Sequence, residues 1–547
     1  MKRTLALVGI VALTTNLLFR FSTVEAQRAP DRHEVETAVP SDEPAASPLP
    51  AKPIPKYRSV RIADVPHVQQ KPDFCGEACT AMYLKKLGRT ANQDDVYDQA
   101  GLDPELGRGC YTRELGRALN RIGFDVGVVW YGVAVAQAES QLESHFRAMH
   151  ADLLAGIPSI ICMRYDDSPD TTEHFRLILG YDAKGDEVLY HEPAVANGAY
   201  RRMARPQLLK LWPLKYAESR WTIVRFRLKP GVLRDIHSTA KFTDADYAQH
   251  VMQIKSKASD EFTVVVQRPF VVAGDESADT VRSRATGTIR WATERLKRAY
   301  FPEDPDEILS IWLFKDKESY DKHTQEIFGD RPDTPFGYYS HTHRALIMNI
   351  DTGGGTLVHE IVHPFMASNF PDCPSWFNEG LASLYEQCGD NRGWIWGKTN
   401  WRLEGLQEAI QAFRDQEAAV AEPTPSVAGD TVDTDGLDDS DMEEDLAEEP
   451  EPVQVFPLPT FKELCGTSTY EFYRRDPGTN YSQARYLCYY LQQRGLLQKY
   501  YRQFRANAQT DPSGYETLKS VLGLRTDEDM EQFKGIWEDW VLTLRYP

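Results

Sequence analysis

Residues 356–363 contain two histidines and a glutamate at a spacing suited to metal chemistry. His359 and His363 are four positions apart, so on a helix both side chains lie on the same face and can bind one metal ion. Glu360 adjoins the first histidine and can take a proton from water that the metal polarises. This pattern predicts a metal-binding helix with a neighbouring proton acceptor.

Pro364 directly follows the second histidine. Proline lacks a backbone N–H and disfavours a helical conformation at the residue before it, so we expect a kink in the helix here. One common zinc motif would add a glycine and a third histidine, but Met366 and Asn369 occupy those positions. That longer motif is therefore absent from this sequence.

A second short motif, Asn378-Glu379-Gly380-Leu381-Ala382, follows in a stretch with helical periodicity. The two motifs together resemble those of the gluzincin metallopeptidases, which include the thermolysin-like and aminopeptidase groups. The resemblance covers about residues 239–544 and is sharpest at 344–386. It implies a peptide substrate and one Zn²⁺ ion with three protein ligands, namely His359, His363 and Glu379.

The same resemblance implies how a peptide would be held and cleaved. Glu360 would act as the general base. The predicted strand at 344–350 would be an edge strand that pairs with the extended substrate. Tyr481 and Tyr486 are candidates for the group that stabilises the oxyanion, and Glu386 is the first alternative as third ligand.

Residues 73–88 have the pattern of a helix with Cys75 in its first turn. At this position the unpaired N–H groups and the helix dipole favour a thiolate over a thiol. Gly76 would leave room for a substrate backbone beside the sulfur. Gln69 and Gln70 precede the helix, and either can donate a side-chain N–H to an oxyanion. The segment therefore has the parts of a cysteine nucleophile with its oxyanion donor.

A cysteine nucleophile needs a base, and the base needs an orienting partner. His174 opens a predicted strand at 174–180, and Glu192 follows a second predicted strand at 187–190. The short segment between these strands predicts a hairpin. A hairpin would bring His174 and Glu192 together across neighbouring strands.

Over about residues 60–228 the chain resembles the papain-fold bacteriocin-processing cysteine peptidases. The resemblance is carried by Val65-Pro66-His67-Val68-Gln69-Gln70, Asp73-Phe74-Cys75-Gly76, His174-Phe175 and Gly180-Tyr181-Asp182. It implies an oxyanion donor, a nucleophile, a base and an orienting acid, in that order Gln70, Cys75, His174 and Glu192. Gln69 is an equal candidate for the donor. Glu192 stands where the family has aspartate, and no transporter ATPase segment accompanies the domain.

Several alternatives remain open at this point. The order of cysteine, histidine and acid also suits transglutaminase-like enzymes and cell-wall amidases. The papain-like domain could instead bind peptides without cleaving them, or both sites could be inactive in a scaffold protein. Cys75 and Cys79 could share a metal ion, although no second matching pair is present.

The pattern of elements predicts an α+β, multidomain protein. We expect a papain-like cysteine peptidase domain at 60–230 and a thermolysin/aminopeptidase-like, gluzincin-type domain at 239–547. Further strands are predicted at 159–163, 262–266, 270–273 and 308–314. Longer helices are predicted at 279–300, 481–504 and 527–544.

The charge of the chain is concentrated in one segment. The 547 residues include 62 basic and 81 acidic side chains, for a net charge of −19. Residues 415–452 hold fifteen acidic and no basic residues, so the remainder carries only −4. This segment is predicted to be a disordered, solvated insertion, with calcium capture or docking as alternatives. The absence of a basic excess excludes a general nucleic-acid binder.

The N-terminus has the pattern of an export signal. Lys2 and Arg3 precede an apolar stretch at 5–18, and small residues follow near Ala26. We therefore expect a signal peptide at 1–26, a Pro-rich linker at 27–59, and a periplasmic or secreted protein, with an uncleaved membrane anchor as the alternative. Eight cysteines are too few for a dense disulfide framework, although Cys373 and Cys388 could pair. The oligomeric state is not indicated.

Overall fold

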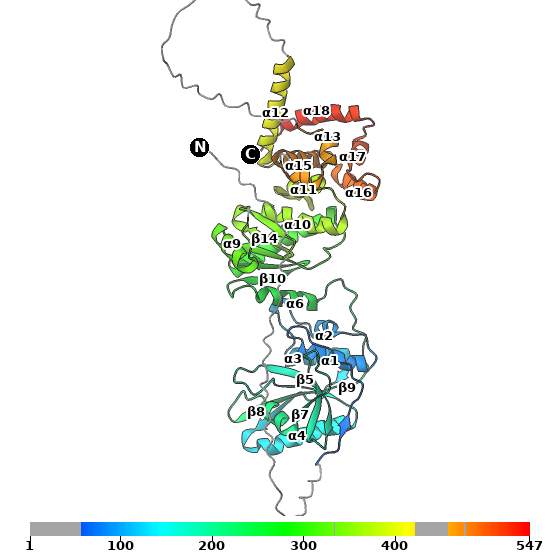
Figure 1. Cartoon of the computed structure of the whole chain (residues 1–547), viewed down its shortest axis with the longest axis vertical. Helices are drawn as coiled ribbons and strands as arrows, with labels where there is room; N and C mark the ends of the chain where they lie inside the picture. The colour runs from blue at the N-terminus through cyan, green and yellow to red at the C-terminus, as the bar shows by residue number, and fades with distance from the viewer. Residues whose placement is uncertain (1–55, 333, 422–457, 475–476) are drawn as a thin grey trace, which may run out of the picture. The chain divides into compact units, whose positions relative to one another are not determined.

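The computed structural model describes residues 56–332, 334–421, 458–474 and 477–547 (Figure 1). The predicted signal peptide and most of the predicted linker and acidic insertion lie outside these residues. The prediction of a disordered segment is wrong for residues 415–421, because they belong to helix α12, Arg402–Ala421. Among the described residues, no helix has both the length and the apolar character needed to cross a bilayer.

The first sheet is antiparallel and has seven strands. The strand order is β3-β8-β4-β5-β6-β7, and β1 pairs with β5. The strands are β1 Val60–Arg61, β3 Trp130–Ala134, β4 Ser159–Arg164, β5 Glu173–Asp182, β6 Glu187–His191, β7 Arg201–Ala204 and β8 Arg220–Arg227. A separate two-stranded pair joins β2 Phe124–Asp125 and β9 Lys229–Pro230. Strands β4, β5 and β6 form where the sequence predicts them, and β5 and β6 make the expected hairpin.

Helices pack on both faces of this sheet, because alternate side chains of a strand point to opposite sides. Ile160 and Cys162 of β4 pack with helices α1 to α3, whereas Ile161 and Met163 pack with α4 and α5. On β5, Phe175 belongs to the cluster that contains α1. The helices are α1 Cys75–Lys86, α2 Gln93–Ala100, α3 Thr112–Ile122, α4 Ala138–Leu154 and α5 Arg205–Leu211.

The second sheet has five strands in the order β10-β11-β12-β14-β13. They are β10 Thr263–Gln267, β11 Phe270–Gly274, β12 Leu309–Phe314, β13 Gly337–Ser340 and β14 Ala345–Asn349. The expected edge strand at 344–350 is an interior strand, because β14 pairs with both β12 and β13. The edge strand next to β14 is β13, whose four residues are too short for the sequence pattern to identify.

Helices α6 Asp244–Lys255 and α9 Lys317–His323 pack on one face of the second sheet, and α10 Gly354–Asn369 packs on the other. The predicted helix at 279–300 is three consecutive segments, α7 Ala278–Arg284, a π-helical turn at Ala285–Arg290 and α8 Trp291–Ala299. The predicted helix at 481–504 is two helices, because Gly495 adopts a left-handed conformation with φ of 68°.

The remaining α-helices and strands are α11 Ser375–Leu384, β15 Cys388–Asn391, β16 Trp394–Gly397, α13 Phe461–Gly466, α14 Thr469–Arg474, α15 Pro477–Gln493, α16 Leu497–Asn507, α17 Tyr515–Leu522 and α18 Asp527–Thr543.

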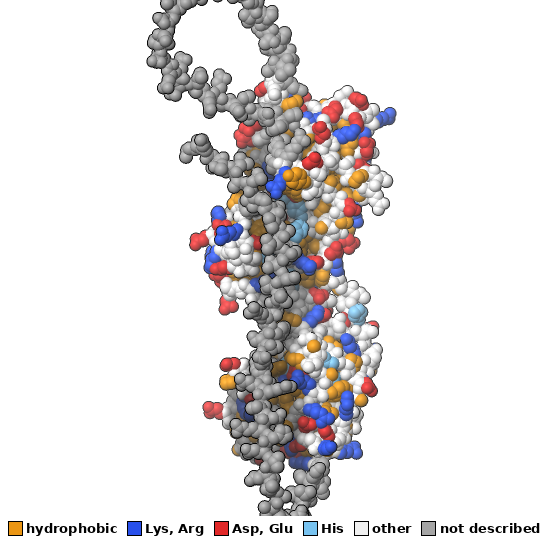
Figure 2. All heavy atoms as spheres, in the orientation of Figure 1, with side chains coloured by type: hydrophobic (Ala, Val, Ile, Leu, Met, Phe, Trp, Pro, Cys, Tyr) orange, Lys and Arg blue, Asp and Glu red, His pale blue; other side chains and the backbone are white. Residues whose placement is uncertain are grey.

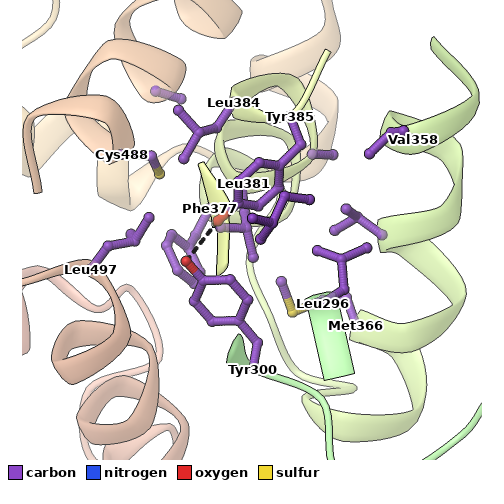
Figure 3. Packing of buried hydrophobic residues seen from close by; sticks show 14 of the residues in the cluster. Leu296, Tyr300, Val358, Met366, Phe377, Leu381, Leu384, Tyr385, Cys488 and Leu497 are labelled. Carbon is purple, nitrogen blue, oxygen red and sulfur yellow. Dashed lines mark hydrogen bonds between the residues drawn. The ribbon is translucent and has the colours of Figure 1, made fainter. Parts of the chain in front are cut away.

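An apolar cluster anchors α11 against α8, α10 and α15 (Figure 3). Phe377 and Leu381 of α11 are fully buried in it. The hydroxyls of Tyr300 and Tyr385 lie 2.7 Å apart, which satisfies both polar groups inside the cluster. This packing fixes the face that α11 turns toward α10.

All eight cysteines are free thiols, so the structure does not contain the disulfide that Cys373 and Cys388 could have formed. On the face drawn in Figure 2, Lys and Arg side chains are interspersed with Asp and Glu. This mixture agrees with the nearly balanced charge expected outside the acidic insertion.

Candidate functional site

Helix α10 carries the two histidines of the first motif. Leu357, Ile361 and Phe365 bury one face of the helix in the core, which leaves His359 and His363 on the side toward α11. A Cβ atom at Gly355 would lie 2.1 Å from the carbonyl oxygen of Glu386, so only glycine permits this close approach. The helix continues beyond the proline that follows the second histidine and ends at Asn369.

The structure brings the three predicted metal ligands together. Glu379 Oε2 lies 3.3 Å from His359 Nε2 and 3.9 Å from His363 Nε2. One ligand atom from each of the three residues falls within 4.8 Å of the others. Buried Glu379 Oε2 has no hydrogen-bond partner among the described residues.

This donor set fits a divalent cation such as zinc. Two imidazole nitrogens and one carboxylate are a common ligand set for catalytic zinc. Burial would raise the pKa of Glu379, but His359 and His363 outweigh it and lower this pKa to about 2. Burial would lower the pKa of His359, but Glu379 and Glu386 raise it to about 10. The cluster therefore favours a positive charge at its centre.

Each histidine has a second contact on its other ring nitrogen. His363 Nδ1 lies 3.1 Å from Asn378 Oδ1, and His359 Nδ1 lies 3.3 Å from Glu386 Oε1. Glu386 thus faces the side of His359 that points away from Glu379. The structure supports an orienting contact for Glu386 rather than the alternative position as third ligand.

Polar groups beside the ligand set include one that the sequence did not predict. Glu360 is half-buried, and burial raises the pKa of its carboxyl group. The Tyr473 hydroxyl donates to Glu379 Oε1 at 2.5 Å. Tyr481 is close enough for burial and the Glu379 charge to raise its pKa. Tyr486 is fully buried and donates to the Asn400 carbonyl, so it serves the core.

Cys75 begins α1, as predicted, but its surroundings do not favour a thiolate. Burial, followed by the negative charge of Glu77, raises the pKa of Cys75 to about 12. Gly76 does not open a space for substrate, because a Cβ atom there would meet the Leu115 side chain at 2.6 Å and that of Phe175 at 3.1 Å. The glycine is required by core packing instead.

His174 and Glu192 are in contact, as the hairpin predicts. His174 Nε2 lies 2.5 Å from Glu192 Oε1. Arg176 Nε donates to the other oxygen of the same carboxylate at 2.6 Å. Burial would raise the pKa of Glu192, but His174 and Arg176 outweigh it and lower this pKa to about 2. The carboxylate is therefore held ionised between two donors.

Among the described residues, no hydrogen bond joins Cys75 to His174. Phe175, the neighbour of His174, packs in the cluster that contains Cys75. Gln70 donates its backbone N–H to the Pro193 carbonyl at 2.9 Å, and its Oε1 is buried without a partner. Gln69 is exposed, whereas Gln70 is half-buried.

Comparison with known proteins bears on the domain that carries Cys75 and His174. Residues 62–221 match the model of the Peptidase_C39 like family. The search of curated proteins finds no match. The chain is thus a mixed α and β, multidomain protein in which residues 62–221 are similar to a family of cysteine peptidases.

Proposed function

We propose that this protein is an exported peptidase with two hydrolytic sites. One is a zinc site formed by His359, His363 and Glu379, and the other is a cysteine site formed by Cys75 and His174. Both would hydrolyse peptide bonds. Export is proposed from the signal pattern at residues 1–26 of the sequence.

The convergence of three ligand atoms within 4.8 Å carries the metal half of this proposal. The unpartnered oxygen of Glu379 supports it further, because a buried carboxylate oxygen without a donor is costly unless a cation binds it. A zinc ion bound there would supply a Lewis acid that polarises the scissile carbonyl and acidifies water. The gluzincin-type assignment of this half rests on the two sequence motifs.

The chain's own residues would then move the protons. Glu360 accepts a proton from the attacking water and passes it to the leaving amine, a role that its raised pKa favours. Tyr473 presents a hydroxyl beside the ligand set, and Tyr481 lies near the same carboxylate. Either hydroxyl can donate to the oxyanion of the tetrahedral intermediate.

The second hydrolytic site is favoured by the family match and by the contact between His174 and Glu192. In this site His174 accepts the thiol proton of Cys75 as the sulfur attacks, Glu192 orients the imidazole and Gln70 donates to the oxyanion. Because burial raises the thiol pKa, the attack depends on this proton transfer to His174.

A library of proteome-derived peptides, digested by three forms of the protein, tests the proposal. Wild type, Cys75→Ala and Glu360→Ala should give three different product sets, because each variant loses the cleavages of one site. Identical product sets from all three would refute peptide hydrolysis at both sites. If only cell-wall peptides or acyl-transfer products depend on Cys75, the cysteine site is an amidase or a transglutaminase-like enzyme.

A further inference from the structure

Arg402, the first residue of α12, forms a bidentate ion pair with Glu386. Arg402 Nη2 donates to Glu386 Oε1 at 2.9 Å, and Arg402 Nε donates to Oε2 at 3.1 Å. Asn400 Nδ2 adds a third hydrogen bond to Oε2 at 3.0 Å. The Glu386 side chain is only 6% exposed, so this carboxylate is held in one position by three donors.

The fixed carboxylate faces a metal ligand. Glu386 Oε1 lies 3.3 Å from His359 Nδ1, whereas His359 Nε2 faces Glu379. A carboxylate at Nδ1 favours the tautomer with a proton on that nitrogen, which leaves the Nε2 lone pair for a metal ion. His359 Nδ1 is buried and makes no hydrogen bond among the described residues, so its 3.3 Å approach to Glu386 is an electrostatic contact.

His359 and His363 differ in the charge of the group beside Nδ1. The partner of His363 Nδ1 is the neutral amide of Asn378, while His359 has a charged partner that itself requires a cation. Arg402 is that cation. The nearby Arg485 donates instead to the backbone carbonyls of Ser383 and Lys398.

We propose that Arg402 is a positioning residue of the metal site, which raises zinc affinity by fixing Glu386 and, through it, His359. Among the described residues, the side-chain hydrogen bonds of Arg402 go to Glu386 and not to His359, His363 or Glu379. Its side chain is also held over the Tyr481 ring, with the guanidinium carbon 5.2 Å from the ring centroid. The inference rests on the proposed zinc site, since it concerns the affinity of that site.

Zinc dissociation constants, measured on the full chain by competition with a chromogenic chelator, test the inference. Arg402→Met should weaken zinc binding by about 10–100-fold, the usual cost of losing an outer partner of a ligand. Arg402→Lys keeps the charge but loses the paired geometry, so its affinity should fall between those of wild type and Arg402→Met. The matched control is Arg414→Met, because Arg414 lies on the same helix and pairs with Asp539 and Glu538 away from the site. The control should bind zinc within about twofold of wild type.

A double-mutant cycle identifies the route of the effect. If Arg402 acts through Glu386, then Arg402→Met combined with Glu386→Gln should weaken binding no more than the stronger single variant. Additive losses, or an Arg402→Met affinity equal to that of Arg414→Met, would overturn the inference. If Arg402→Met does not fold, Arg402→Lys with Glu386→Gln gives the same cycle. A wild-type protein that binds no zinc would instead refute the proposed metal site.

Discussion

Arg176 donates a hydrogen bond from Nε to Glu192 Oε2 at 2.6 Å inside the first sheet. The guanidinium also donates to the backbone carbonyls of Tyr165 and Arg164. Since His174 lies two positions before Arg176 on β5, both side chains reach the same face of the sheet and the same carboxylate. One carboxylate therefore serves both side chains, Oε1 for His174 and Oε2 for Arg176.

Arg176→Met should destabilise the β5–β6 hairpin strongly. The substitution leaves the buried Glu192 carboxylate without its cation, a change that costs about 3–5 kcal/mol. Hydrogen exchange of the β5 and β6 amides measures the loss locally. The control is Arg202→Met, because Arg202 also pairs with two carboxylates next to this hairpin but is 52% exposed. It should cost less than about 1 kcal/mol, and equal effects of the two variants would contradict a special role for Arg176.

Glu192 should also make the stability of this region depend on acid. Its pKa in the folded protein is about 2, below the ordinary 4.5. Because the folded pKa is lowered, the stabilisation is complete above pH 4.5 and is lost as the pH falls toward 2. Glu192→Gln should remove this pH dependence from the β5 amides. An unchanged acid profile in the variant would show that other carboxylates cause it.

Cys75 should alkylate slowly at neutral pH and faster as the pH rises, because its pKa is raised to about 12. The charge of Glu77 is the second cause after burial, so Glu77→Gln should increase the rate at pH 9. Each unit by which the pKa falls increases the thiolate fraction about tenfold. Iodoacetamide labelling of Cys75, quantified by mass spectrometry, gives the rate, with Glu139→Gln on the exposed surface as control. Rapid labelling of the wild type at pH 6 would mean that the thiolate forms without substrate.

The site features that the sequence could predict are those set by the spacing of residues within one or two neighbouring elements. The histidines of α10 and the glutamate of α11 lie in motifs of a few residues, and helix geometry then determines their directions. The hairpin that joins His174 to Glu192 also follows from a local turn between two strands. In each of these cases one or two adjacent elements contain all the information needed.

Partners from distant segments could not be predicted in this way. Tyr473 contacts Glu379 across 94 positions of the chain, and no pattern around it distinguishes it from other tyrosines. Nothing in the sequence around Arg176 or Arg402 distinguishes them from other arginines. Their importance follows from the buried carboxylate that the fold places beside each. The prediction of open space beside Gly76 was wrong, because the side chain of Leu115 from another helix fills that space.

The last prediction separates metal binding from proton transfer at the metal site. Glu379→Ala removes a ligand, and the two remaining histidines should hold zinc weakly, so the purified variant should contain much less than one equivalent. Glu360→Gln keeps the shape of the side chain but cannot accept a proton, so this variant should retain zinc while its turnover falls by about 10²–10⁴-fold. Elemental analysis gives the zinc content, and peptide hydrolysis in the presence of a thiol-blocking reagent isolates the turnover of the metal site. A full equivalent of zinc in Glu379→Ala would mean that the third ligand lies elsewhere. Glu386 would then be the first residue to test, because its carboxylate already lies 3.3 Å from His359.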